Sequence, residues 1–388
     1  MNRRTSIGWL SVLPIAIAWL APVPARAFGQ VNAPVPPPMA IPRAASCQTW
    51  QIVPVPSPRS DHAALAAAAA SSPSNVWAVG YSAPQSQTSL ATLTEHFDGT
   101  RWRIIRSPTV GNDAQLMGVA VISPADAWAV GDGIPSGSQK TVPLLLHWDG
   151  TRWARVRNPA FRGAGRLRGV SATSASDVWA VGTAQTGTTS RTLIEHFDGT
   201  LWSVIPSPSP DISAQLFAVT AISATDAWAA GTSVLPSQAN HTLLEHWDGA
   251  KWSVVLAPDQ GEAVEGVAAS SSQDVWAVGL GRTIRDSLAD HFDGTSWTEV
   301  PTPTPSIVVN ELLGVGVVSR SEAWAAGAFY DHGLHTLIEH WDGSAWSVSF
   351  QGDLGSLSGV ATVPGGGTWA VGSLGQGTTV NPFAAFNC

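Results

Sequence analysis

Residues 177–182 read DVWAVG, and this stretch decides the fold because its centre recurs along the whole chain. The tetrapeptide W-A-[VA]-G occurs seven times, and consecutive copies are separated by 51, 51, 49, 48, 48 and 45 residues. A repeat of this length is typical of propeller blades, whereas helical solenoid repeats are usually shorter. The seven copies begin at Trp77, Trp128, Trp179, Trp228, Trp276, Trp324 and Trp369.

Each repeat is predicted to contain four short strands. An alternating stretch such as residues 116–123 comes first, and the W-A-[VA]-G strand follows a short polar turn. A variable loop leads to a third strand, such as residues 192–197, and an Asp-Gly turn leads to a fourth strand that starts at Trp202. Four strands separated by turn signals make one blade, and no segment has a helical period. We therefore expect an all-β, seven-bladed β-propeller.

A small residue stands ten positions before each repeated tryptophan. We expect this position to lie where the first strands crowd around the central axis, because only glycine or alanine lets neighbouring backbones approach closely. The residues are Ala67, Gly118, Gly169, Ala218, Gly266, Gly314 and Gly359.

The two ends of the propeller are predicted to meet in one blade. Six repeats have an Asp-Gly turn, but the last repeat ends at Cys388 without a fourth strand. Residues 47–58 match a fourth strand in spacing, so we expect them to complete the last blade and close the ring, which removes two exposed sheet edges. The expected blades are residues 59–108, 109–159, 160–208, 209–258, 259–303, 304–351, and 352–388 together with 47–58.

The same alignment brings the two cysteines together. Matching Phe386 to Phe197, and Trp50 to Trp202, places Cys388 and Cys47 on the same turn glycine. We therefore predict a Cys47–Cys388 disulfide, worth about 4–5 kcal/mol on the chain-entropy model. A reactive or metal-binding pair is the disfavoured alternative, because such chemistry needs reduced thiols.

The N-terminus has the features of an export signal. Arg3 and Arg4 precede an apolar run over residues 7–21, and residues 25–27 (ARA) form a cleavage site, so we predict a signal peptide over residues 1–27. The general secretory route is favoured over the twin-arginine route. Residues 28–46 are rich in proline and alanine and are predicted to be a linker, with the propeller domain over 47–388. We expect a secreted, extracellular or periplasmic protein.

Charge excludes two classes of partner. Without residues 1–27, the chain has 17 basic and 28 acidic residues, a net charge of −11. Nucleic acids and anionic membranes both need clustered cations, so neither is expected as a partner, and no later stretch is long and apolar enough for membrane insertion. We expect a monomer without a cofactor or a metal.

Histidines and tryptophans that recur once per repeat are assigned to structure. Histidines in successive blades cannot converge on one ion, so we expect each to make a hydrogen bond inside its blade. All mature tryptophans fill repeat positions and are assigned to the core between blades. The histidines are His96, His147, His196, His246, His291 and His340, and Glu95, Glu195, Glu245 and Glu339 are assigned to structure on the same grounds.

The repeat motifs resemble those of known propellers. The D-G-x-x-W turn resembles the Asp-box of bacterial sialidase-type propellers, one residue shorter. D-V-W-A-V-G combined with D-G-T-x-W is similar to the propeller of photosystem II assembly factors and to secreted bacterial proteins described as kelch-like. The resemblance covers residues 47–388 and implies the fold. Sialidase activity is not implied, because the chain has no Arg-Ile-Pro motif and only two tyrosines, Tyr81 and Tyr330.

Function is expected on the face where the repeats differ. The turns on one face are uniform, whereas the connections on the other face vary in length and chemistry, as binding loops on a rigid scaffold do. Candidate ligand-binding residues there are Arg166, Arg168, Glu265, Arg282, Arg285, Glu311, Tyr330 and His332. Weak catalytic candidates are Tyr330, Asp331, His332, His335, Glu265 and Glu311, because they have acid–base side chains.

Two main hypotheses follow. The leading one is a non-catalytic recognition or scaffold propeller that binds a glycan or a protein through the variable face. The alternative is a lyase or hydrolase that acts on extracellular polysaccharide through residues of the fifth and sixth repeats, since two carboxyls on adjacent blades could support such chemistry. Fold alone does not separate them.

Overall fold

The computed structural model describes residues 49–58, 62–83, 89–111, 113–158, 161, 163–237, 239–258, 263–283, 285–375 and 379–388. Within these residues the chain forms strands and turns and contains no helix. It follows that no helix in this part of the chain could cross a membrane. The predicted signal peptide, the predicted linker and Cys47 lie outside the described residues.

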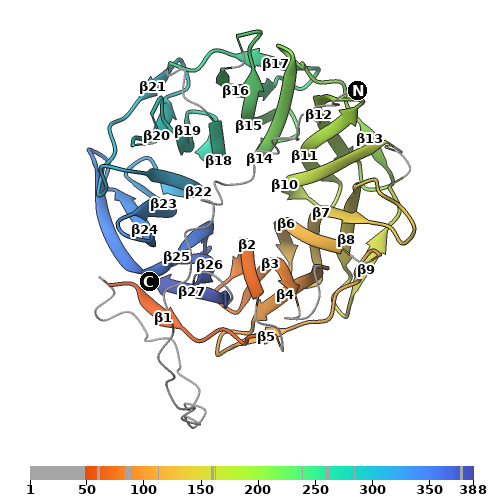
Figure 1. Ribbon diagram of the computed structural model, residues 1–388, viewed down its shortest axis with the longest axis horizontal. Coiled ribbons are helices and arrows are strands. Elements are labelled where there is room, and N and C mark those ends of the chain that lie inside the picture. Colours follow the sequence, from red (N-terminus) through yellow and green to blue (C-terminus); the bar gives the residue numbers. More distant parts are fainter. Residues whose placement is uncertain are drawn as a thin grey trace, which may run out of the picture. The chain divides into compact units, whose positions relative to one another are not determined.

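Five sheets have four antiparallel strands each, paired in chain order as expected for blades (Figure 1). Their strands are β2 (His62–Ser72), β3 (Asn75–Ala83), β4 (Ala91–Phe97) and β5 (Trp102–Ile104); β6 (Asp113–Ser123), β7 (Asp126–Ile134), β8 (Val142–Trp148) and β9 (Trp153–Val156); β10 (Ala164–Ser174), β11 (Asp177–Thr186), β12 (Thr189–Phe197) and β13 (Trp202–Val204); β14 (Ser213–Ser223), β15 (Asp226–Val234), β16 (Asn240–Trp247) and β17 (Trp252–Val255); and β18 (Ala263–Ser271), β19 (Asp274–Leu280), β20 (Ser287–Phe292) and β21 (Trp297–Glu299).

The sixth sheet has seven strands, where two separate blades were expected. Its order is β1-β27-β26-β25-β24-β23-β22, and β25 belongs to both halves: residues 346–354 pair with β24, and residues 355–362 pair with β26. Every other connection at this place contains proline, but residues 349–355 (SFQGDLG) contain none, so the chain stays extended. The strands are β22 (Asn310–Ser319), β23 (Glu322–Tyr330), β24 (Leu334–Trp341), β25 (Trp346–Thr362), β26 (Thr368–Leu374), β27 (Asn381–Asn387) and β1 (Gln51–Val53).

The first strands form a closed cycle. β2 contacts β6, the contacts continue in turn through β10, β14, β18, β22 and β25, and β25 contacts β2 (Figure 1). Neighbouring backbones approach closely at the predicted small residues. A Cβ on Gly169 would lie 2.9 Å from the Cα of Ala218, and a Cβ on Gly359 would lie 2.8 Å from the Cα of Ala67. Larger residues would therefore force the first strands apart.

The repeated tryptophans fill the space between sheets, as predicted. Trp77 is 1% exposed, and its ring lies 4.8 Å from that of Trp148 and 5.0 Å from that of Trp153, both in the following sheet. The same arrangement closes the cycle, since Trp369 contacts Phe97 at 4.8 Å and Trp102 at 5.1 Å. Aromatic packing therefore joins the end of the chain to its beginning.

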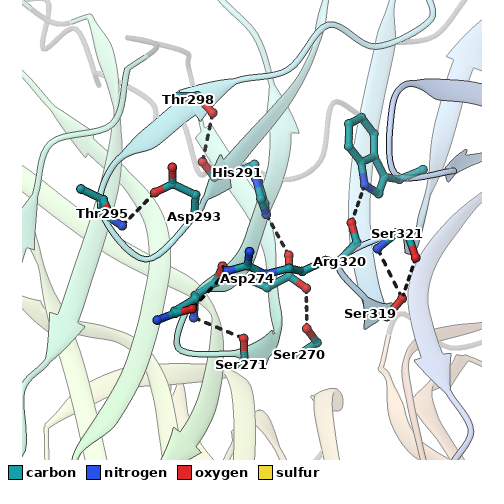
Figure 2. Close-up of polar contacts among 12 residues, drawn as sticks. Ser270, Ser271, Asp274, His291, Asp293, Thr295, Thr298, Ser319, Arg320 and Ser321 are labelled. Atoms are coloured by element: carbon teal, nitrogen blue, oxygen red, sulfur yellow. Dashed lines mark hydrogen bonds and ion pairs between the residues drawn. The ribbon is translucent and has the colours of Figure 1, made fainter.

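The repeated histidines bond the turn before the second strand, inside their own sheets. His291 Nε2 lies 2.8 Å from Asp274 Oδ1, and Asp293 accepts a hydrogen bond of 2.8 Å from the backbone N–H of Thr295; Figure 2 shows both contacts as dashed lines. The histidine pairs span 2.7–2.9 Å, and they are His96–Asn75, His147–Asp126, His196–Asp177, His246–Asp226 and His291–Asp274. The predicted structural role is confirmed for these five.

The repeated glutamates lie in the interior of the sheets. Glu95, Glu245 and Glu339 have fully buried carboxyls without a hydrogen-bond partner within the described residues, and burial raises the pKa of each to about 8. Glu195 differs, because Asn158 Nδ2 donates to its carboxylate at 2.7 Å, and its pKa is raised to about 7, mainly by burial. These groups are protonated over most of the acidic range.

The last repeat is shifted by one residue from the predicted alignment. Trp369 pairs with Phe386, whereas Trp179 pairs with His196, so Phe386 takes the place of the histidine. Asn387 then takes the place of the aromatic residue, and Cys388 that of the turn aspartate. The ring of Phe386 lies over Gly367, where a Cβ would come within 2.5 Å of it, so Gly367 and Phe386 replace the bonded acid and histidine together.

The shift leaves the cysteine prediction in place without testing it. No cysteine among the described residues is free. Because Cys47 lies outside the described residues, the Cys47–Cys388 disulfide stays a prediction.

Candidate functional site

The first strand of each repeat contains a β-bulge, which changes the direction of one side chain. The register shifts after the apolar residue that recurs in each first strand, so the next residue has no cross-strand partner, as between Leu167 and Gly169. The bulged residues therefore form a ring of seven equivalent positions with different side chains. They are Ala66, Met117, Arg168, Phe217, Glu265, Leu313 and Ser358.

Arg168 is the central cation of the site. Its Cζ lies 5.0 Å from the ring centroid of Phe217, the bulged residue of the next sheet, in a cation–π contact. Its Nε is buried and has no hydrogen-bond partner within the described residues. Burial lowers the pKa of Arg168, and the opposing charge of Glu265 raises it. Arginine nevertheless stays charged, so the site holds a half-buried cation with spare donor capacity.

Two buried carboxyls extend the site: Glu265, in β18, interacts with Arg168, and Glu311, in β22, interacts with Glu265. Burial raises the pKa of Glu265, and the charge of Arg168 opposes that shift. Glu311 is 6% exposed, and burial, followed by the charge of Glu265, raises its pKa to about 7. The two acids therefore repel each other, and Glu311 changes protonation state near neutral pH.

A third acid joins the site from the opposite side. Asp132, in β7, is 7% exposed and accepts a hydrogen bond of 3.1 Å from Gln115 Nε2 across the β6–β7 pair. Burial raises its pKa, and the charges of Arg166 and Arg168 oppose that shift. We call Asp132, Arg166, Arg168, Glu265 and Glu311 the central cluster. Its members interact electrostatically although they come from four sheets.

The central cluster can bind a polar ligand in two ways. Guanidinium groups bind carboxylates and sulfates through paired hydrogen bonds, which suits Arg166 and Arg168. The carboxyls of Glu265 and Glu311 can accept hydrogen bonds from hydroxyls, and a protonated Glu311 can also donate one. A carboxyl with a pKa near 7 can also act as a general acid or base.

The loop residues of the sixth repeat do not form a constellation with one another. The side chain of His332 is fully exposed, and its Nε2 lies 3.7 Å from Asp331 Oδ1. His335 is held elsewhere, because its ring stacks on Phe329 at 5.3 Å and its Nε2 lies 3.0 Å from the backbone oxygen of Asp331. Tyr330 contributes its backbone, whose N–H donates to the carbonyl of Val309 at 3.0 Å. Within the described residues, no hydrogen bond joins the side chains of Tyr330, Asp331, His332 and His335 to one another.

The arginines of the fifth repeat lie on an exposed turn between β19 and β20. Arg282 and Arg285 are both exposed, and the carbonyl of Arg285 accepts a hydrogen bond of 2.6 Å from Asn310 Nδ2. Within the described residues, no electrostatic interaction joins Arg285 to Arg168, Glu265 or Glu311. Also within this part of the chain, no group of three or more potential ligands could hold a metal ion.

Two members of the site were not singled out from the sequence as binding residues. Asp132 lies four residues after Trp128, at a position held by tyrosine, threonine, leucine, alanine or serine in the other repeats, and this exception is the available signal. The second is Phe217, an aromatic residue that does not recur in the other repeats. Its role depends on the bulge, which turns it toward Arg168.

Comparisons with known proteins identify the fold. No family model matches the chain, and no curated protein matches it. A solved structure of YCF48 bound to D1 peptide is 12% identical, covers 89% of this chain and 99% of its own, and has a TM-score of 0.54. A polysaccharide lyase of family PL25, ulvan lyase, bound to a sugar with GlcA and Rha3S units, is 9% identical, covers 88% and 95%, and has a TM-score of 0.57. With its repeated four-stranded sheets, the chain is a β-propeller repeat protein.

Proposed function

We propose that this chain is an exported recognition propeller that binds an extracellular glycan or protein through the central cluster. One observation carries the proposal: the charges of Asp132 and Glu265, from two other sheets, act on Arg168, whose buried Nε lacks a partner within the described residues. Burying charge is unfavourable unless the charge is paired, so such a cluster is expected where a ligand completes the pairing.

The propeller has seven blades in this proposal. The seven-stranded sheet counts as two blades that share β25, because its two halves pair with different neighbours. Seven bulges and seven close-approach positions support this count. The seventh blade is composite, with β1 from the N-terminal side beside β27, and the proposed Cys47–Cys388 disulfide would fasten these strands.

The favoured ligand carries acidic groups and hydroxyls. Arg166 and Arg168 would hold a carboxylate or sulfate, while Glu265 and Glu311 would bind neighbouring hydroxyls. An acidic sugar in a glycan, or an acidic residue of a protein beside polar side chains, meets these requirements.

A binding screen tests the proposal. The purified chain is applied to an array of acidic and neutral polysaccharides, and captured ligands are titrated by calorimetry. Arg168→Ala is expected to weaken binding at least about 10-fold, because truncating a charged partner in a buried site removes about 1.4 kcal/mol or more. Arg152→Ala is the matched control, since the Arg152 side chain is 80% exposed and its ion pair within the described residues is with the neighbouring Asp149. Equal binding by Arg168→Ala and the wild type would refute the assignment of the site.

A second candidate is an enzyme that cleaves an acidic polysaccharide. The observation that favours it is Glu311, whose pKa of about 7 suits proton transfer at neutral pH. The test is product release from acidic polysaccharides as a function of pH. Turnover that follows a group with a pKa near 7 and is lost in Glu311→Gln would support the enzyme. Binding without turnover would reject the enzyme and support the recognition function.

A further inference from the structure

A cavity of about 900 Å³ opens between the two halves of the seven-stranded sheet, away from the central cluster. Trp324, Glu322 and His340 line it from β23 and β24, and Asn387 lines it from β27. Gly365–Gly367, in the turn before β26, form part of the rim.

The cavity exists because one aromatic side chain is missing. At the other six junctions, the repeated tryptophan contacts the residue before the Asp-Gly turn of the next sheet, with ring centroids 4.8–5.0 Å apart. Asn387 holds that position opposite Trp324, and Trp50 meets the Trp324 ring in an edge-to-face contact at 5.2 Å. Trp324 is 8% exposed, whereas the other six are at most 3% exposed.

Polar groups around the opening lack partners. Asn387 is 8% exposed, and its side chain makes no hydrogen bond within the described residues. Glu322 stands where five other sheets place the aspartate or asparagine that bonds the histidine, yet no hydrogen bond joins it to His340 in this part of the chain. The Asn387 amide lines the cavity and therefore has hydrogen-bonding capacity for a molecule bound there.

The lining favours a cation. Hydrogen bonds, first from Ser344, lower the pKa of Asp342 to about 2, so its carboxylate is ionised at neutral pH beside that of Glu322. None of the described residues that line the cavity is lysine or arginine. The indole of Trp324 reaches the cavity beside carboxylates, and an indole together with carboxylates is a combination that binds organic cations. The guanidinium of arginine fits best, because its plane stacks on an indole while its N–H groups bond carboxylates and amides.

We propose that this cavity binds an arginine side chain of a partner peptide. Trp324 would provide the stacking surface, Glu322 the opposing charge, and Asn387 a hydrogen-bond acceptor. The site is independent of the central cluster, so Arg168→Ala should leave it unchanged.

Calorimetric titration with two small probes tests the charge requirement. Acetyl-arginine amide is compared with acetyl-citrulline amide, which has the same shape but a neutral urea group. Arginine amide is expected to bind at least 10-fold more tightly, and Glu322→Gln should weaken its binding at least 3-fold. Glu299→Gln, at an exposed position on β21, is the control and should have no effect. Equal binding of the two probes, or no binding of either to the full chain, would overturn the proposal.

A cavity-filling variant tests the location without unfolding the protein. Asn387→Phe restores the aromatic residue found at the other junctions, so it should raise the melting temperature and weaken binding of acetyl-arginine amide at least 10-fold. Unchanged binding by this variant would place the probe elsewhere and overturn the proposal. Binding that emerges only after residues 28–46 are deleted would also overturn it, because the chain's own segment would then be the occupant.

Discussion

His291 holds its sheet together through two contacts of different kinds. Its Nε2 bonds the fully buried carboxylate of Asp274 at 2.8 Å (Figure 2). Its ring lies 4.5 Å from that of Trp276. Burial alone would raise the pKa of Asp274, but hydrogen bonds from His291 and Ser270 outweigh it and lower the pKa. The carboxylate is therefore buried and charged, and it depends on the histidine.

His291→Leu is expected to lower the free energy of unfolding by about 2–3 kcal/mol, because it leaves a buried charged group short of a partner. His340→Leu is the matched control, since His340 stacks on Trp324 at 4.1 Å without a bonded carboxylate in the described part of the chain. His340→Leu should lower the free energy of unfolding by about 1 kcal/mol less than His291→Leu, or by a still smaller amount. Urea denaturation measures both variants, and equal losses would show that stacking alone matters.

The bulge in each first strand shows where sequence reasoning reaches its limit. The repeat predicted the strands and placed Arg166, Arg168, Glu265 and Glu311 on the variable face. It did not predict the bulge, because the bulged position holds residues as different as alanine, phenylalanine and serine. Asp132 was missed for a related reason: it lies on a second strand, and only cross-strand register brings it beside Gln115.

β1 is short, yet it closes the sheet that joins both ends of the propeller. Trp50, just before this strand, is 8% exposed, packs on Trp324, and donates a hydrogen bond of 3.2 Å to Ser349 Oγ. Trp50→Ala is expected to lower the free energy of unfolding by about 3–5 kcal/mol, as truncation of a large buried aromatic usually does.

Ile52→Ala is the matched control for this prediction, because Ile52 lies within β1 but is 58% exposed. Its effect should stay within about 0.5 kcal/mol. If Trp50→Ala unfolds at the same denaturant concentration as the wild type, β1 does not contribute to closure.

Several sheets of the propeller contain a buried glutamate carboxyl, and these carboxyls determine how the free energy of unfolding changes with pH. The pKa of Glu95, Glu245 and Glu339 is about 8 in the folded state, against about 4.3 in an unfolded chain. Between these values the folded state binds more protons than the unfolded state, so stability falls as pH rises. Below about pH 4 the turn carboxylates act oppositely, because the pKa of Asp149 and of Asp342 is lowered to about 2.

Thermal stability is therefore expected to be greatest near pH 4–5 and to decline toward pH 8, by up to about 1.4 kcal/mol per pH unit for each buried carboxyl. Melting curves at constant ionic strength measure this. Glu95→Gln should flatten the slope between pH 5 and 8, whereas the exposed control Glu299→Gln should not change it. A melting temperature that rises steadily up to pH 8 would contradict the prediction.

The ring of blades could be predicted from the sequence because the motifs of each blade recur. The places where one repeat departs from the others could not be predicted in this way. The tryptophan spacing and the small residues at close approach were sufficient for the blades and the closed cycle of first strands. The shift of Phe386 by one residue could not be read from the last repeat, since the Asp-Gly turn that fixes register elsewhere is absent there. The continuity of β25 likewise could not be predicted, because it depends on the absence of proline from residues 349–355, and this absence is not part of the repeat motif.

The pairing of β1 with β27 has a topological consequence. Ile52 stands opposite Ala385, so the two ends of the folded region leave from adjacent strands of one sheet. The chain could therefore begin and end at another connection between sheets without changing how the sheets are arranged around the ring. A circular permutant that joins these ends through a short linker, and begins instead in the connection at residues 205–212, should assemble the same set of sheets.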